Sequence, residues 1–195
     1  MIFGAAPWSD GEASVYRVTD VNGAYAGTAR YDLTRLDEAT WNLRRETSAQ
    51  GTQEIVVVDM SVGEYRPSLA TMVRIDSRGT EQVRTTYSGS EANLELTSKQ
   101  NITTYQRVSI PSDARDQRSL VMLVRALPLA ADYATRLNSF LPIVPVLDRV
   151  TLSVRGQEEV QVPAGTFEAW KVRLDTGDSE TLLWVGVDAP HPVVK

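Results

Sequence analysis

The sequence predicts a mainly β protein, a curved antiparallel sheet or an open or half barrel of about ten to twelve strands with one covering helix. Apolar and polar residues alternate in TARYDLT (28–34), WNLRRE (41–46) and VTLSVR (150–155). Because successive side chains of a strand face opposite sides, these segments are typical of strands with one face in water. Turn signals rich in Gly, Asn and Asp recur between such segments.

The predicted strands follow one another along the chain and are separated by short turns. The turns are VNG (21–23), DSRG (76–79), SGS (88–90) and DTGD (175–178). Besides the three alternating segments, composition predicts strands near 15–19, 55–60, 69–76, 82–87, 93–98, 102–108, 157–162, 166–175 and 181–187.

One amphipathic helix is expected near 113–127, where it covers the apolar face of the sheet or closes an open end. Asp113 is placed to cap it, and Pro128 ends it. Its apolar stripe comprises Leu120, Leu123, Val124 and Leu127. The next segment, 128–147, contains two prolines that argue against a long helix, and it is read as either a further strand or irregular chain.

Length and composition narrow the function classes. The 195 residues predict one β domain spanning 1–195, and the ending HPVVK in mid-strand favours a piece of a longer chain. The net charge of −5 disfavours nucleic acid as a partner. The chain has no Cys and one His, so no metal or other cofactor is expected. No stretch reaches the roughly 20 apolar residues of a membrane-spanning helix, and MIFGAAPW is too short for a signal peptide.

The segment QVPAGTFEAW (161–170) reads as a hairpin rather than a catalytic loop. Pro163 suits the first corner of a type I turn, and Gly165 suits the left-handed position of a glycine bulge after it. The flanking segments alternate as strands do. No general base stands near Thr166 in sequence, and the turn lacks the several glycines of a phosphate-binding loop.

The same stretch resembles a known bacterial family. VPAGTFEAWKV, followed by LLWVGVDAPHPVVK, looks like the C-terminal signature of the domain of unknown function 3108 family, and DGEASVYRVTDVNGAYAGTARYDL resembles the opening of that family more loosely. The resemblance implies a curved antiparallel sheet similar to the half-barrel of lipoprotein carrier proteins. It also implies a periplasmic or other extracytoplasmic location in the bacterial envelope. The resemblance assigns no catalytic residues to this chain.

Two short motifs, DAPH (188–191) and DTGD (175–178), contain residue types found in catalytic and metal sites, but each also fits a structural turn. Asp188 and His191 form DAPH, in which a carboxylate can orient an imidazole for general-base chemistry, but the flanking Pro190 and Pro192 favour a rigid turn. The acidic loop DTGD has too few ligands for a defined calcium loop.

The strand TLLWVGV (181–187) has apolar residues on both faces and must therefore be covered twice. Core packing is the ordinary role of such residues, and lining a ligand cavity is the alternative. The residues assigned to a ligand site are Trp41, Trp170, Leu183 and Trp184.

We therefore expect a noncatalytic protein of the cell envelope that binds an apolar or lipid-like small molecule, with peripheral or no membrane contact. Two alternatives remain open: a hydrolase that uses Asp188 and His191, and a structural module whose exposed strand edges pair with another protein. The sequence leaves the oligomeric state open.

Overall fold

A computed structural model describes residues 2–195, which form thirteen strands in two sheets and a short helical segment. Sheet A holds eight strands in the order β1 to β8, and every strand pairs antiparallel with its sequence neighbour. The strands of sheet A are β1 (Glu12–Thr19), β2 (Tyr25–Arg35), β3 (Thr40–Ala49), β4 (Thr52–Ser61), β5 (Pro67–Asp76), β6 (Gly79–Ser88), β7 (Glu91–Thr97) and β8 (Thr103–Ser109).

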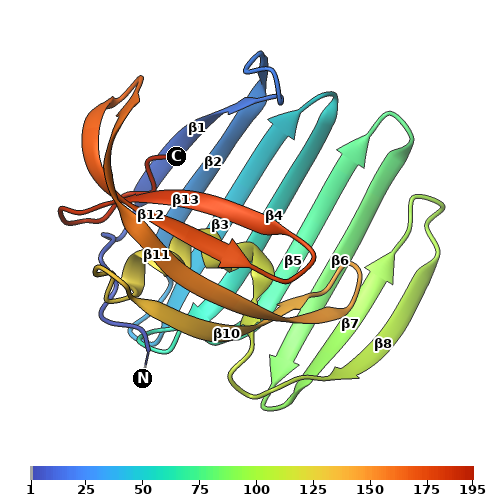
Figure 1. Ribbon diagram of the computed structural model, residues 1–195. Helices are drawn as coiled ribbons and strands as arrows, with labels where there is room; N and C mark the ends of the chain where they lie inside the picture. Colours follow the sequence, from blue (N-terminus) through green and yellow to red (C-terminus); the bar gives the residue numbers. More distant parts are fainter. Residues whose placement is uncertain (1) are drawn as a thin grey trace.

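Sheet B has the order β13-β12-β11-β10-β9 and crosses in front of sheet A (Figure 1). Its last strand, β9, runs parallel to β10, and the other neighbours are antiparallel. Sheet B covers the β1–β5 side of sheet A and leaves the β7–β8 end open, so the whole is a curved half barrel (Figure 1). Its strands are β9 (Arg115–Asp116), β10 (Ala134–Leu141), β11 (Val146–Val162), β12 (Gly165–Asp175) and β13 (Glu180–Gly186).

The helical segment is shorter than the sequence predicts. It comprises η1 (Gln117–Ser119), α1 (Leu120–Leu123) and η2 (Val124–Ala126), so the expected start near 113 is wrong. Asp116, not Asp113, caps it by accepting a bond from the Arg118 amide. Residues 115–116 instead pair with β10, and the Asp113 carboxylate accepts from Asn138 at 2.8 Å. The expected stop is confirmed, because the residue before Pro128 is extended.

Two adjacent predicted strands, 150–155 and 157–162, are one long strand. The β11–β12 register shifts between Val154 and Gly156, and Gly156 has φ +132° in the region that favours glycine. This bulge bends β11, so that its hairpin with β12 projects past β1 (Figure 1). At the end of the hairpin Val162 pairs with Gly165, which confirms the predicted turn at Pro163–Ala164. The segment 128–147, for which the sequence left a strand and irregular chain as alternatives, contains strand β10.

The main core lies between β2–β4, the helical segment and sheet B. Alternation supplies one apolar row per strand, as with Leu43 and Val58, which pair across β3 and β4. Two smaller clusters continue along sheet A, one under β4–β6 and one under β7. The largest fully buried side chains include Tyr65, Phe140, Leu33, Leu43, Met60, Met72, Met122, Leu123 and Leu152.

Candidate functional site

An open cleft of about 380 Å³ lies on the inner face of sheet A at the end that sheet B leaves uncovered. Its floor is a cross-strand row, because Val83 on β6 pairs with Leu96 on β7, and Leu96 pairs with Thr104 on β8. Ile143 lines it from the β10–β11 turn. The remaining lining residues are Glu81, Gln82, Thr97, Ser98 and Ile102. The cleft therefore combines apolar side chains with a few polar groups, the usual make-up of a small-molecule site.

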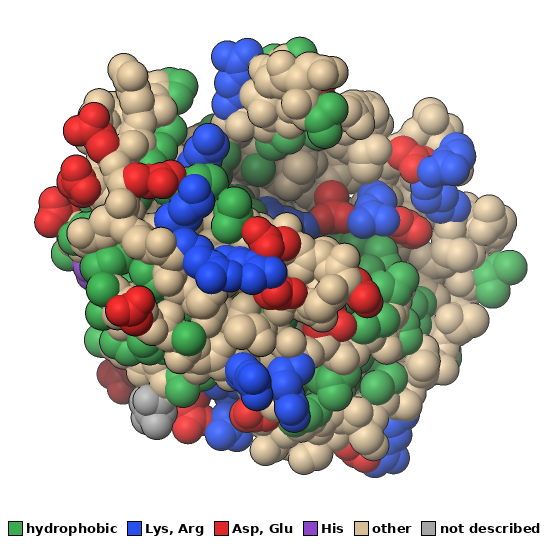
Figure 2. All heavy atoms as spheres, viewed as in Figure 1, with side chains coloured by type: hydrophobic (Ala, Val, Ile, Leu, Met, Phe, Trp, Pro, Cys, Tyr) green, Lys and Arg blue, Asp and Glu red, His purple; other side chains and the backbone are tan. Residues whose placement is uncertain are grey.

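The β10–β11 turn forms an apolar lip beside this cleft. Its sequence from 141 to 147 is LPIVPVL. Val144 is 55% exposed and Leu147 is 44% exposed. Figure 2 shows hydrophobic side chains gathered between this turn and strands β6–β8. The two prolines that disfavoured a helix here hold an exposed apolar turn, and this run of apolar residues is the sequence signal that marks the lip.

A ladder of alternating charges runs along the inner face of sheet A to the rim of the cleft. It comprises Arg45, Glu54, Arg74 and Glu81, on β3 to β6 in that order. The Arg74 guanidinium donates to Glu54 at 3.0 Å and to Glu81 at 2.9 Å. Burial lowers the pKa of Arg74, but the bonds and charges of its two carboxylates more than offset this, and the pKa is raised. The ladder is neutral as a whole and holds Glu81 at the cleft rim against Arg74.

A buried polar cluster joins sheet A to the helical segment. The Tyr87 hydroxyl donates to the Asp116 carboxylate at 2.7 Å, and Arg118 donates to both oxygens of that carboxylate at 2.8 and 2.6 Å. Burial, together with the charge of Asp116, raises the pKa of Tyr87 well above its usual range. Asp116 also caps the helical segment. The bond from Tyr87 therefore fixes the start of the helical segment against β6, and the bidentate bonds from Arg118 engage the same carboxylate, so the cluster has a structural role.

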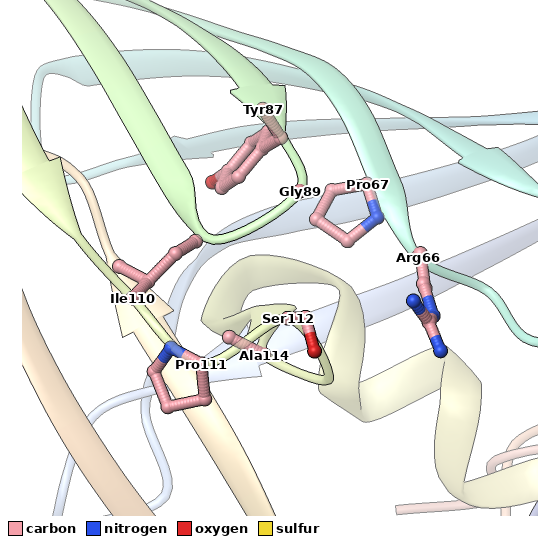
Figure 3. A pocket seen from close by; sticks show the side chains of 8 residues that line it. All are labelled: Arg66, Pro67, Tyr87, Gly89, Ile110, Pro111, Ser112 and Ala114. Carbon is pink, nitrogen blue, oxygen red and sulfur yellow. The ribbon is translucent and has the colours of Figure 1, made fainter.

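A second, smaller pocket of about 80 Å³ lies at the opposite end of β6 (Figure 3). Tyr87 and Gly89 lie on one side of it, and Pro111 and Ser112 on the other, with Arg66 at its edge (Figure 3). Ligand sites typically reach about 300 Å³ or more. The space suits a few water molecules, so the larger cleft is the candidate site.

Two of the four residues assigned to a ligand site lie in the main core. Trp41 is 5% exposed and Leu183 is 6% exposed. Trp170 is half-buried and packs against the same core. None of these three lines either pocket. That they contact a ligand stays a prediction.

Trp184 lies on the outer face of sheet B. Its ring lies between the ammonium groups of Lys171 and Lys195, at 5.2 and 4.9 Å from the ring centre, and its indole N–H donates to Glu158. That hydrogen bond is the main cause of the lowered pKa of Glu158. TLLWVGV therefore does present apolar groups on both faces, as the sequence indicated, with Leu183 inward and Trp184 outward. The contacts of Trp184 hold the C-terminal residues against β13.

The DAPH motif is a turn built around a buried arginine. The His191 Nδ1 lies 3.1 Å from the Gly186 carbonyl oxygen, and the His191 amide donates to the Asp188 carbonyl. Arg125 donates to the carbonyl oxygens of Pro190 and His191 and to the Glu12 carboxylate. The motif thus ties β1, the helical segment and the C-terminus together. These main-chain contacts favour the interpretation of His191 as part of a rigid turn.

Across residues 2–195, no group of three or more His, Cys, Asp or Glu side chains is arranged to hold a metal ion. No helix among these residues has the length and hydropathy needed to span a membrane.

The chain belongs to a family of proteins of unknown function, DUF3108, whose model matches residues 14–195. The match includes the C-terminal VPAGTF and DAPHPVVK segments and, from residue 14 onward, the β1–β2 hairpin, which are the two regions that suggested the resemblance. No curated protein and no solved structure matches the chain.

Proposed function

We propose that the protein binds an apolar or lipid-like molecule noncatalytically, and that the cleft between β6–β8 and the β10–β11 turn is the binding site. One observation carries the proposal: an open cleft of about 380 Å³ whose floor and lip are apolar. This volume lies in the range of small-molecule sites, about 300–1,000 Å³. The occupant that fits best is the acyl chain of a lipid or fatty acid, since the floor offers aliphatic side chains and the polar groups lie among them.

The exposed lip supports the same assignment. A group of exposed apolar side chains beside a cleft is typical of a ligand-binding groove. Ile102 is 62% exposed in the β7–β8 turn, and Val144 is 55% exposed in the β10–β11 turn. An acyl chain between these two turns removes both side chains from water. The charge ladder that ends at the rim of the cleft is internally paired, so it leaves the apolar groups as the main source of affinity.

We place the protein in the bacterial cell envelope, where lipids and acylated molecules are abundant. The motif resemblance to a family of exported bacterial proteins supports this location. The proposal also transfers the expected ligand contacts from the tryptophans of the core to Val83, Leu96 and Ile143.

The test uses a dansyl-labelled long-chain fatty acid as the fluorescent probe and lipid analysis of an organic extract of the protein purified from a bacterial host. Ile143→Asp places a charge in the cleft and should abolish probe binding. The matched control is Val21→Asp, because Val21 is fully exposed in the β1–β2 turn. This variant should bind the probe as the parent protein does. Unchanged binding by Ile143→Asp, or no binding by the parent protein, rejects the cleft. Loss of binding in Trp184→Phe instead would move the site to sheet B.

A further inference from the structure

Arg115, on β9, is a buried cation without an acidic partner. Three arginines of the described chain are buried, and two of them, Arg118 and Arg125, each pair with a carboxylate. Within residues 2–195, the hydrogen bonds of Arg115 go instead from its Nη1 to two carbonyl oxygens, and its Nε has no partner. A buried charge without an opposite charge is costly. This guanidinium is therefore a candidate ligand for an anion from outside the chain.

The Arg115 guanidinium lies beside the smaller pocket, at the end of β6. Its bonds to the Asp113 and Ala114 carbonyls fold the side chain back onto the turn 110–114. Residues 110–112 and 114 of that turn line the pocket. Among residues 2–195, its Nη2 has no bond and is not enclosed as Nε is. A cation thus lies next to one wall of a space of about 80 Å³.

Arg66 brings a second guanidinium to the same pocket. It lines the space, and in Figure 3 its side chain extends from the start of β5 towards Ser112. Burial lowers the pKa of Arg115, and the nearby charge of Arg66 lowers it further. Two like charges are thus held close together at the pocket, an arrangement that an anion between them stabilises.

Two carboxylates lie in the neighbourhood, and both are engaged elsewhere. The Asp113 carboxylate accepts from Asn138 at 2.8 Å. Glu64 lies 2.7 Å from the Nε of Arg66, and both of these side chains are about half exposed. Exposed ion pairs of this kind add little to stability, so an anion in the pocket competes with Glu64 for Arg66 at small cost.

We propose that Arg115 and Arg66 bind a phosphate group in the small pocket at the end of β6, with the Ser112 hydroxyl as a third donor. The volume holds a few water molecules and hence a group of that size, but not an acyl chain. Guanidinium groups bind phosphate through pairs of parallel hydrogen bonds. Two guanidinium groups also match the charge of a phosphate group, about −1.5 to −2 at neutral pH.

Two sources supply such a group: inorganic phosphate, and a phosphate monoester such as the headgroup of a glycerolipid. The small pocket lies at the opposite end of β6 from the open cleft, and the two share no lining residue. The inference is therefore independent of ligand binding in the cleft, and each can fail without the other.

An NMR titration of the ¹⁵N-labelled protein with sodium phosphate tests the proposal, with sodium chloride at equal ionic strength as the reference. The amide signals of Gly89 and Ser112 and the Nε–H signal of Arg115 should shift and saturate, with a Kd of about 1 mM. Glycerol 3-phosphate is the second probe. Binding about tenfold tighter than inorganic phosphate assigns the site to a phosphate monoester, and equal or weaker binding assigns it to the free anion.

Three variants locate the site. Arg115→Gln should abolish saturable binding, and Arg66→Gln should weaken it about tenfold. Glu64→Gln removes the competing carboxylate and should bind phosphate more tightly than the parent protein. The matched control is Arg155→Gln, which makes the same change at an exposed arginine on β11 and should bind as the parent does.

The titration also decides against the proposal in three cases. Shifts that sodium chloride reproduces overturn it, as does saturable binding that Arg115→Gln retains. A Glu64→Gln variant that binds no more tightly than the parent, together with an Arg66→Gln variant that binds as tightly, overturns it as well. These last two variants change exposed side chains, so they keep the test decisive if circular dichroism shows that Arg115→Gln does not fold.

Discussion

The Arg125 guanidinium donates a hydrogen bond of 2.9 Å to the main-chain carbonyl of His191, although 66 residues separate the two. The same guanidinium bonds to Glu12 and lies 5.6 Å from the centre of the Trp8 ring. Its side chain is 1% exposed. One buried cation thus satisfies acceptors from the N-terminal strand and from the C-terminal turn.

Arg125→Met should therefore lower the free energy of unfolding by about 3 kcal/mol, because it leaves two carbonyl groups and the Glu12 carboxylate without their donor. Urea denaturation measures this loss. The control is Arg30→Met, which breaks a surface pair with Asp32 in which the Arg30 side chain is 51% exposed. That change should cost far less, because exposed ion pairs add little to stability. Equal losses in the two variants would contradict the role of Arg125.

Arg118→Met should destabilise the protein by about 3–5 kcal/mol, because it leaves the Asp116 carboxylate buried without its partner. The Asp116 residue is fully buried and Arg118 is 7% exposed. The double variant Arg118→Met with Asp116→Leu removes both charges and should recover part of the loss, as measured by urea denaturation. A double variant as unstable as the sum of the two single variants would show that the pair is not coupled.

Acid should weaken the fold through Asp76. The hydrogen bond from Lys99, together with the Arg78 amide, lowers the pKa of Asp76 from 3.8 to about 2. A lowered pKa stabilises the folded state above the unfolded value. The contribution of Asp76 is therefore full above pH 3.8 and is lost as the pH falls towards 2.

Urea denaturation between pH 6 and pH 2 follows this effect, and NMR titration reads the pKa of Asp76 directly. Lys99→Met should move that pKa back towards 3.8 and reduce the loss of stability in this interval. Asp76→Asn removes the titrating group and serves as the control. A pKa of Asp76 that stays near 2 in Lys99→Met would assign the shift to the backbone amide instead.

Much of the fold was predictable because its signals are local. Alternation in 28–34, 41–46 and 150–155 depends only on the geometry of a single strand, and each segment lies within a strand of the structure. The four turn signals depend on residues that tolerate turn geometry, and each marks a connection between two consecutive strands. The same holds for Pro163–Ala164, which ends β11.

The helix was predicted too long for a nonlocal reason. Residues 113–116 have helix-compatible composition, but pairing with β10 takes 115–116 into sheet B, and Asp113 bonds to Asn138. The cleft proposed as a ligand site depends on nonlocal contacts as well. Tryptophan content indicated Trp41 and Trp170, which pack in or against the core, whereas the open cleft joins three neighbouring strands to a turn near residue 143.

The sequence by itself determined a mainly β half barrel, the family, the turns and the face of each strand that turns inward, because periodicity, turn chemistry and short motifs act over a few residues. Only the tertiary structure decided that sheet B covers β1–β5, that Arg125 joins the two ends of the chain, and that β6–β8 keep an open cleft. These features depend on contacts between residues far apart in the chain, and such contacts leave no local pattern in the sequence.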